Sequence, residues 1–138
     1  MKPTIAGMRG VEDAARRAAQ NAYCPYSKFP VGAAVLTETG TIFTGCNVEN
    51  ASFGLCNCAE RTALFTAVAA GERKITAVAI YTPTQTATAP CGACRQALNE
   101  FTADMLVISV CDSADRIELP LKELLPASFG PSNLAASR

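Results

Sequence analysis

The stretch "CNCAERTALFTAVAAG", residues 56–71, places two cysteines and a glutamate at the start of a predicted helix. A second stretch, "PCGAC" at residues 90–94, places a C-x-x-C pair at the start of another. The chain contains no histidine. Any metal ion bound by side chains would therefore be held by cysteine, aspartate or glutamate.

Helix and strand signals extend outward from these two stretches. The helix over residues 58–71 closes at Gly71, a residue type favoured just past a helix end. Residues 91–101 form a second helix, introduced by Pro90. The remaining elements that we expect are a helix over residues 11–23, strands over residues 31–37, 41–48, 75–82 and 105–111, and a short strand with a final helical turn over residues 116–125.

Apolar strands that alternate with helices indicate a sheet covered by helices on both faces. The connection "ETG" between the first two strands suits a hairpin, so the sheet should be mixed rather than purely parallel. We expect an α/β fold with three α/β/α layers and a mixed, mostly five-stranded sheet. The length of 138 residues predicts a single domain over residues 1–138, with mobile ends at residues 1–10 and 130–138.

Charge and composition narrow the classes of partner. The chain carries 12 basic and 12 acidic residues without a basic block, which disfavours DNA or RNA, because polynucleotide binding depends on neutralised phosphates. Its amino terminus lacks the apolar core of a secretory signal, and its apolar runs are too short to cross a bilayer. We therefore expect a cytoplasmic protein with no membrane partner. In that reducing compartment, seven cysteines indicate metal binding or burial rather than disulfides.

The cysteines near the two helix starts differ in what they can do. Cys91 and Cys94 match a metal half-site, because adjacent turns of backbone can aim both sulfurs at one point. The amides and dipole of the predicted helix start also favour thiolates. A structural zinc site would need a second C-x-x-C pair, which the sequence lacks. If Cys58 alone joins the pair, three thiolates leave one coordination position for water, as in catalytic sites. If Cys56 joined as well, the site would be closed.

Glu60 lies two residues past Cys58, within the first turn of the same predicted helix. A carboxylate placed there can approach a metal-bound water without ligating the metal. An isolated C-x-E would more simply be a solvated glutamate favoured by the helix dipole, but its combination with P-C-x-x-C favours catalysis. A thioredoxin-like redox pair is an alternative for the C-x-x-C motif. The other cysteines lie in or beside apolar stretches and are most simply buried: Cys24, Cys46 and Cys111.

Five blocks, in order, resemble the cytidine deaminases, specifically their small, homotetrameric, zinc-dependent branch. They are "YCPYSKFPVGAA", "GCNVENAS", "CAERTA", "PCGACRQ" and "ELLPASF", and the resemblance extends over residues 22–129. Zinc deaminases are characterised by a three-ligand cysteine or histidine site, a glutamate that does not ligate the metal, and a P-C-x-x-C signature.

The resemblance implies one zinc ion per subunit, held by Cys58, Cys91 and Cys94, with Glu60 as the proton shuttle. Cys56 matches no ligand position. The other site residues that the resemblance implies are Arg61, which would hydrogen-bond to ligand sulfurs, and the substrate-binding positions Phe29, Asn47, Glu49, Ala51 and Phe129. The polar pair in "NVEN" would contact ribose hydroxyls, and the aromatic in "LLPASF" would stack on the base in a neighbouring subunit's site.

The implied function is hydrolytic deamination of cytidine and 2′-deoxycytidine in pyrimidine salvage, by a homotetramer with shared active sites. A blasticidin-S-type deaminase is an alternative that departs at "NVEN", and deaminases of polynucleotides, guanine or deoxycytidylate commonly use a histidine ligand. A non-catalytic zinc-stabilised module and a redox protein are alternatives from other classes. "NVENAS" could also be polar turn chemistry, and Phe129 could pack inside its own subunit.

Overall fold

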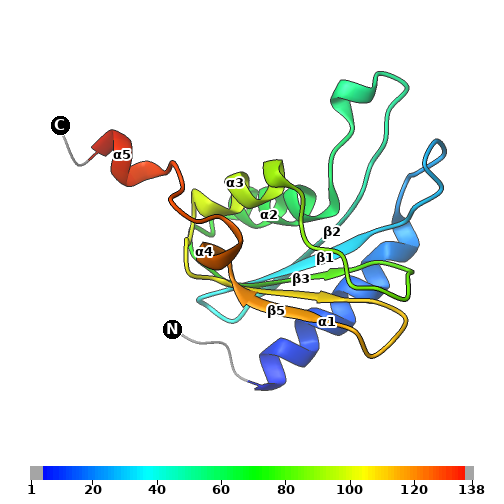
Figure 1. The fold of residues 1–138 in the computed structure, drawn as a ribbon, viewed down its shortest axis with the longest axis horizontal. Coiled ribbons are helices and arrows are strands. Elements are labelled where there is room, and N and C mark those ends of the chain that lie inside the picture. The colour runs from blue at the N-terminus through cyan, green and yellow to red at the C-terminus, as the bar shows by residue number, and fades with distance from the viewer. Residues whose placement is uncertain (1–4, 136–138) are drawn as a thin grey trace.

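The computed structural model describes residues 5–135, with five strands joined in one sheet and helices on both of its faces (Figure 1). In chain order the α-helices and strands are α1 (Ile5–Ala18), β1 (Gly32–Thr37), β2 (Ile42–Cys46), α2 (Ala59–Ala69), β3 (Ile75–Tyr81), α3 (Gly92–Asn99), β4 (Leu106–Val110), β5 (Ile117–Pro120), α4 (Leu121–Leu124) and α5 (Pro131–Ala135). Two single 3₁₀ turns complete them, η1 (Ala19–Asn21) and η2 (Phe53–Leu55).

The strand order in the sheet is β2-β1-β3-β4-β5. Strands β3 and β4 are parallel, and the other neighbouring pairs are antiparallel. The parallel pair is connected through α3, as a crossover connection requires. The prediction of a mixed five-stranded sheet in an α/β fold is confirmed.

Two apolar layers hold the helices against the sheet. Helix α1 covers one face, where Val11 and Ala15 pack against β1, β3 and β4. Helices α2 and α3 cover the other face. There Leu64 and Leu98 are fully buried against residues of β1, β3 and β4 whose side chains point to that face, such as Val35, Val78 and Val107. Both helix starts with cysteines therefore lie on one side of the sheet (Figure 1).

Helix α2 sits unusually close to strand β2 because β2 carries a glycine at the contact. A Cβ atom on Gly45 would lie 2.3 Å from the backbone nitrogen of Ala63 and 2.7 Å from the carbonyl oxygen of Ala59. Glycine is the residue that permits such backbone approach. This contact sets the distance of α2 from the sheet, and with it the position of the residues at the start of the helix.

Helical residues reach further into both ends of the chain than the sequence led us to expect. Helix α1 begins at Ile5 and not near residue 11, because Met8 and Val11 pack on the sheet and Gly10 fits closely against Ile42. Such tertiary contacts override the poor helix propensity of glycine. Residues 131–135, expected to be part of a mobile end, form α5, which Pro131 opens. Residues 1–4 and 136–138 of those ends lie outside the described residues, so the single domain and the mobile ends stay predictions.

Across residues 5–135, every helix falls short of the combination of length and apolar character needed to cross a bilayer.

Candidate metal centre and active site

Cys58 is held in place by the first turn of α2 and by the chain segment before it. It is the N-cap residue of α2, with an extended backbone (φ −73°, ψ 154°). Its carbonyl oxygen accepts hydrogen bonds from the backbone nitrogen and the hydroxyl of Thr62, both at 3.1 Å. The side-chain amide of Asn57 in turn donates to the Thr62 hydroxyl at 2.9 Å. The orientation of Cys58 is therefore fixed from both sides of the helix start.

The other end of α2 is closed by Gly71. This residue has φ +100°, and its N–H donates to the carbonyl of Val68, while the next N–H, of Glu72, donates to the carbonyl of Ala67. This pair of bonds is the Schellman arrangement, which requires a residue that tolerates positive φ. The predicted position of Gly71 just past the helix end is confirmed.

Helix α3 carries the C-x-x-C pair at its start, as α2 carries Cys58. Cys91 is its N-cap, with φ −66° and ψ 166°, and Cys94 lies fully buried one turn later. The guanidinium of Arg95 folds back and donates from Nε to the carbonyl of Pro90 at 2.7 Å. The chain before Cys91 is therefore fixed by a residue of the helix that follows it.

The two helix starts bring Cys58, Cys91 and Cys94 together. Their sulfur atoms all lie within 4.8 Å of one another, and the Cys58 and Cys91 sulfurs are 3.9 Å apart. Zinc–thiolate bonds of about 2.3 Å in tetrahedral geometry place two sulfurs about 3.8 Å apart. Among the described residues this is the one group of three or more metal-ligating side chains that could hold an ion. The spacing and the thiol donors fit zinc.

Arg61 supplies positive charge to this cluster from the first turn of α2. Its Nη2 donates to the Cys58 sulfur at 3.2 Å, and its Nε is buried without a hydrogen-bond partner among the described residues. A hydrogen bond from the Cys94 thiol, with the bond and charge of Arg61, lowers the pKa of Cys58 to about 5. The pKa of Cys94 is raised, because it shares its proton with Cys58 and is buried near Glu60. These contacts therefore favour the thiolate form of Cys58, which is the form that ligates a metal.

Glu60 is buried beside the cluster, with 5% of its surface exposed. Burial, with a smaller contribution from the negative charge of Cys58, raises its pKa to about 7, although its own backbone N–H and Arg61 act in the opposite direction. A carboxyl group of this pKa exchanges protons in both directions near neutral pH. A solvated glutamate at an exposed helix start would not be buried in this way. The burial of Glu60 therefore favours the catalytic interpretation.

Cys56, only two residues before Cys58, lies outside the cluster. Its sulfur accepts a hydrogen bond from the backbone nitrogen of Asn50 at 3.4 Å and lies 3.6 Å from that residue's carbonyl oxygen. It therefore fixes the irregular loop between β2 and α2. Of the three cysteines expected to be buried, Cys111 is buried, whereas Cys24 and Cys46 are half-buried.

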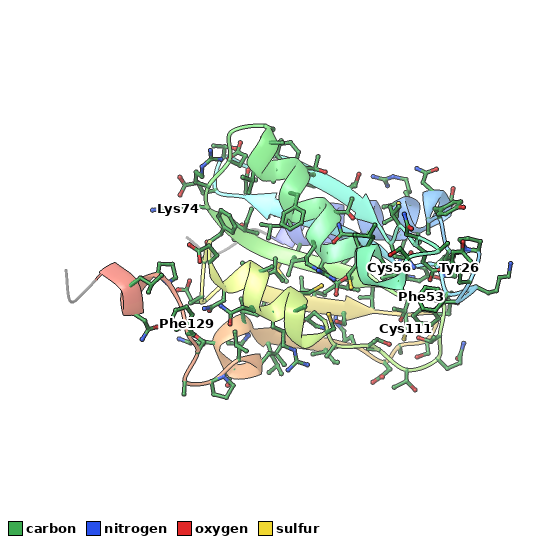
Figure 2. The ribbon with its side chains drawn as sticks, turned by 90° about the horizontal axis from the view of Figure 1, so that it is seen from above. Tyr26, Phe53, Cys56, Lys74, Cys111 and Phe129 are labelled. Carbon is green, nitrogen blue, oxygen red and sulfur yellow. The ribbon has the colours of Figure 1, made fainter. Side chains whose placement is uncertain are left out.

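The predicted nucleoside-binding residues of "KFPVG" and "NVENAS" lie in two adjacent loops. The amide of Asn47 accepts from the backbone nitrogen of Val31 and donates to the carbonyl of Phe29, both at 2.8 Å. Glu49 accepts from the backbone nitrogens of Tyr26 and Ser27 through one carboxylate oxygen. These bonds join the two loops, and Figure 2 shows Tyr26 and Phe53 from them side by side near Cys56, with ring centroids 5.7 Å apart. Ala51 is exposed in the same region.

Phe129 does not lie with the other predicted site residues. Figure 2 places it at the end of the molecule opposite to Cys56, and its side chain is 59% exposed. In this arrangement it lies far from Tyr26 and Phe53 of the predicted nucleoside-binding loops (Figure 2).

Three comparisons with known proteins agree. Residues 9–110 match the family described as "Cytidine and deoxycytidylate deaminase zinc-binding region". The chain belongs to this deaminase family. The prediction of a zinc-binding domain is therefore confirmed, and the Cys58, Cys91 and Cys94 cluster could hold the ion.

Individual deaminases of this family cover nearly the whole chain. A cytidine deaminase of Sporosarcina psychrophila is 45% identical over 121 residues, which are 87% of this chain and 89% of that protein. One from Halalkalibacterium halodurans is 47% identical over 114 residues, which are 82% and 86% of the two chains. The crystal structure of cytidine deaminase from Burkholderia pseudomallei aligns with a TM-score of 0.84 and 48% identity, covering 88% of this chain and 98% of that one.

Some residues that build this deaminase site carry no recognisable signal in the sequence. Asn57 and Thr62 orient Cys58 through side-chain hydrogen bonds, yet neither residue type is a metal ligand or a proton carrier. Thr62 stands inside the block "CAERTA", four residues past the N-cap, where a hydroxyl can reach the carbonyl of the preceding turn. That spacing is the one feature by which it could have been found.

Proposed function

We propose that this protein is a zinc-dependent enzyme that converts cytidine and 2′-deoxycytidine to uridine and 2′-deoxyuridine, consuming water and releasing ammonia. One observation carries the proposal: a buried carboxyl group, Glu60, with a pKa of about 7, lies beside three thiols that are spaced for zinc. The cytidine deaminases that the chain resembles at 45–47% identity support the choice of substrate.

The chemistry is divided between the metal and Glu60. Zinc held by the three cysteines would supply a Lewis acid that lowers the pKa of a water molecule, so that this water can lose a proton and attack the amino-bearing ring carbon. Glu60 accepts a proton from that water and delivers it to the ring nitrogen beside this carbon, which makes the carbon electrophilic. Glu60 then takes the proton of the hydroxyl group added to the ring carbon and transfers it to the amino group. The carbon–nitrogen bond breaks, ammonia leaves, and the ring carbon becomes the carbonyl carbon of uridine. A single carboxyl group with a pKa near 7 can serve as base and then as acid.

Arg61 offsets part of the thiolate charge. Three thiolates carry more negative charge than a dication can balance, which weakens its action as a Lewis acid. The bond from Arg61 to the Cys58 sulfur and the two helix starts withdraw electron density from the ligands.

The nucleoside would be held by residues of more than one subunit. We assign base and ribose contacts to Phe29, Asn47, Glu49 and Ala51, and stacking on the base to Phe129 of a neighbouring chain. The position of Phe129, at the end of the molecule opposite to Tyr26 and Phe53, supports the second assignment (Figure 2). Large apolar side chains exposed at both ends of the molecule support assembly into a homotetramer: Tyr23, Tyr26, Phe53, Leu55 and Phe129. A cytoplasmic location, a role in pyrimidine salvage, and the absence of nucleic-acid and membrane partners belong to the same proposal.

A substrate panel tests this function. The purified protein is incubated with cytidine, 2′-deoxycytidine, cytosine, CMP and blasticidin S, and the loss of cytosine absorbance is followed together with ammonia release. We expect turnover of both nucleosides, with one ammonia released per uridine or 2′-deoxyuridine formed. Turnover of blasticidin S alone would move the protein to the antibiotic deaminases, and no turnover of either nucleoside would refute the proposal.

A further inference from the structure

The segment that carries Phe129 is bound to the metal-bearing helix α3 by three side chains. We call this segment, residues 124–129, the arm. At its start, Nη1 of Arg95 donates to the carbonyl of Leu124 at 2.9 Å. At its end, the carbonyl of Phe129 accepts from Nε2 of Gln96 at 2.8 Å and from Nδ2 of Asn99 at 3.2 Å. Helix α3 therefore contacts the arm at both ends.

The backbone between these two attachment points is strained. Ala127 has φ +52°, in the left-handed region that residues with a Cβ atom avoid. Such conformations persist where the surrounding contacts determine them. Here the bonds from α3 to Leu124 and Phe129 lie on either side of Ala127 and fix the direction in which the arm leaves the turn.

Asn99 is an unusual residue to find at this contact. Only 5% of its surface is exposed, and its Oδ1 atom is buried without a hydrogen-bond partner among the described residues. Its Nδ2 bond goes to the carbonyl of Phe129, and a Cβ atom on the next residue, Gly130, would lie 3.1 Å from that nitrogen. A buried amide with an unsatisfied oxygen lowers stability. The hydrogen bond from Nδ2 to the arm is the interaction in this structure that accounts for an asparagine at this position.

We propose that Gln96 and Asn99 are positioning residues that aim the ring of Phe129 out of its own subunit and into the nucleoside site of a neighbouring copy. This inference rests on the proposed function, in which Phe129 stacks on the base.

Both residues hold the main chain, so the aromatic side chain is left exposed for the neighbour. They stand on the helix that also carries Cys91 and Cys94, so one rigid element fixes half of its own metal site and the ring that it offers to another site. Figure 1 shows the chain beyond the arm, α5, projecting away from the sheet layers, as a segment directed to a second copy would.

A kinetic double-mutant cycle tests whether Gln96 acts through Phe129. Gln96→Leu removes the amide from an exposed position where misfolding is not expected, and Gln96→Glu removes the donor at the same length. Losing one such hydrogen bond should raise KM for cytidine about 2- to 10-fold, with kcat and zinc content little changed. In a Phe129→Ala background, Gln96→Leu should have almost no further effect, because coupled residues are non-additive.

Gln85→Leu is the matched control, because Gln85 is exposed and its side chain makes no hydrogen bond with a described residue. Amide hydrogen exchange in metal-free protein gives a readout independent of activity. Exchange over residues 127–133 should become faster in Gln96→Leu and in Asn99→Leu than in the wild type and Gln85→Leu.

The outcomes are separable. An unchanged KM in Gln96→Leu, an equal effect with and without Phe129, or unchanged exchange in the arm would overturn the positioning role while leaving the proposed function intact. An inactive wild type would refute the proposed function and this use of the arm together. Gln96→Leu subunits keep an intact active site, and inactive Glu60→Gln subunits keep an intact arm. In mixed assemblies an intact arm can therefore reach an intact site, and KM should return toward the wild-type value. If mixing leaves KM unchanged, action between subunits is refuted.

Discussion

Cys56 and Cys58 are separated by a single residue and have different surroundings. The Cys58 sulfur lies with those of Cys91 and Cys94, whereas the Cys56 sulfur contacts the backbone of Asn50. The difference follows from the chain direction at the start of α2, where Cys58 is the N-cap and Cys56 still belongs to the loop. One cysteine can therefore ligate a metal and the other stabilises a loop.

Serine substitutions separate these two roles. Cys58→Ser should reduce bound zinc from one ion per chain to near zero, because a serine hydroxyl is a poor zinc ligand. Cys56→Ser should retain zinc, because its sulfur is outside the cluster and a hydroxyl can still bond to the Asn50 backbone. Zinc content is measured by atomic emission on purified variants. Loss of zinc in Cys56→Ser, or its retention in Cys58→Ser, would contradict the ligand assignment.

Arg61 affects the ionisation of Cys58 in the metal-free protein. Arg61→Ala removes a donated hydrogen bond and a positive charge that both favour the thiolate, so the pKa of Cys58 should rise above its value of about 5. The pH dependence of thiolate absorbance measures the change. Arg73→Ala is the control, because Arg73 bonds to carbonyls at the far end of α2. If the lowest thiolate titration stays at the same pH in Arg61→Ala, this electrostatic role is wrong.

The sequence predicts the residues that perform chemistry better than those that position them. Cys58 and Glu60 are recognisable because few residue types bind zinc or carry protons. The bond from Asn57 to Thr62 and the bonds of Asn47 to Phe29 and Val31 depend on how distant segments pack, and polar residues of this kind occur in any loop. The resemblance marks Asn47 as a substrate-binding position, but no sequence pattern predicts these hydrogen bonds to other segments.

Among the helices and strands, α2 illustrates how an element sets a site. Its start carries Cys58, Glu60 and Arg61, its end is closed at Gly71, and its distance from the sheet is set by Gly45. The metal site therefore depends on Gly45, a residue of β2 that takes no part in the chemistry.

Gly45→Ala should move α2 and destabilise the protein. The added methyl group would overlap the backbone of Ala59 and Ala63, and overpacking of this kind costs about 1–3 kcal/mol. The midpoint of urea unfolding should fall, and zinc affinity should fall with it. Gly54→Ala is the control, because its added Cβ would meet no atom within 4 Å. Equal midpoints for the two variants would show that α2 does not depend on this contact.

Element types were predictable where a pattern was local and long. The apolar strands β3 and β4 and the Gly71 stop of α2 read directly from the sequence. The start of α1 could not be predicted from the sequence, because the glycines at 7 and 10 suggest a loop. Packing against β2 and the rest of the sheet makes this segment helical. Helix α5 was missed because its stability comes from local capping by Asn133 in a short polar segment.

For the molecule as a whole, large apolar side chains are exposed at several places, and two of these lie at opposite ends. Phe53 and Leu55 are 71% and 69% exposed in the loop that leads to Cys56, and Phe129 is 59% exposed at the end of the molecule opposite to Phe53 and Cys56 (Figure 2). Groups of exposed large apolar residues indicate contact surfaces. Two different surfaces on one chain allow closed assemblies of more than two copies.

Sedimentation velocity tests the proposed assembly. We expect a particle of about four times the chain mass of 14.4 kDa. Phe53→Ser should weaken the assembly and lower activity at low protein concentration, because burial of this ring drives association. Lys28→Ser is a control on the neighbouring exposed loop that removes no aromatic ring. A fully active monomer would contradict the shared site.

The central claim is that one carboxyl group, Glu60, moves the protons beside a three-cysteine zinc site. The most direct test measures zinc content and uridine formation from cytidine in Glu60→Gln, which keeps the size of the side chain and removes its acid–base function. We predict one zinc ion per chain, as in the wild type, with turnover reduced by at least ~10²-fold. A zinc-free variant, or one with full turnover of cytidine, would contradict this account.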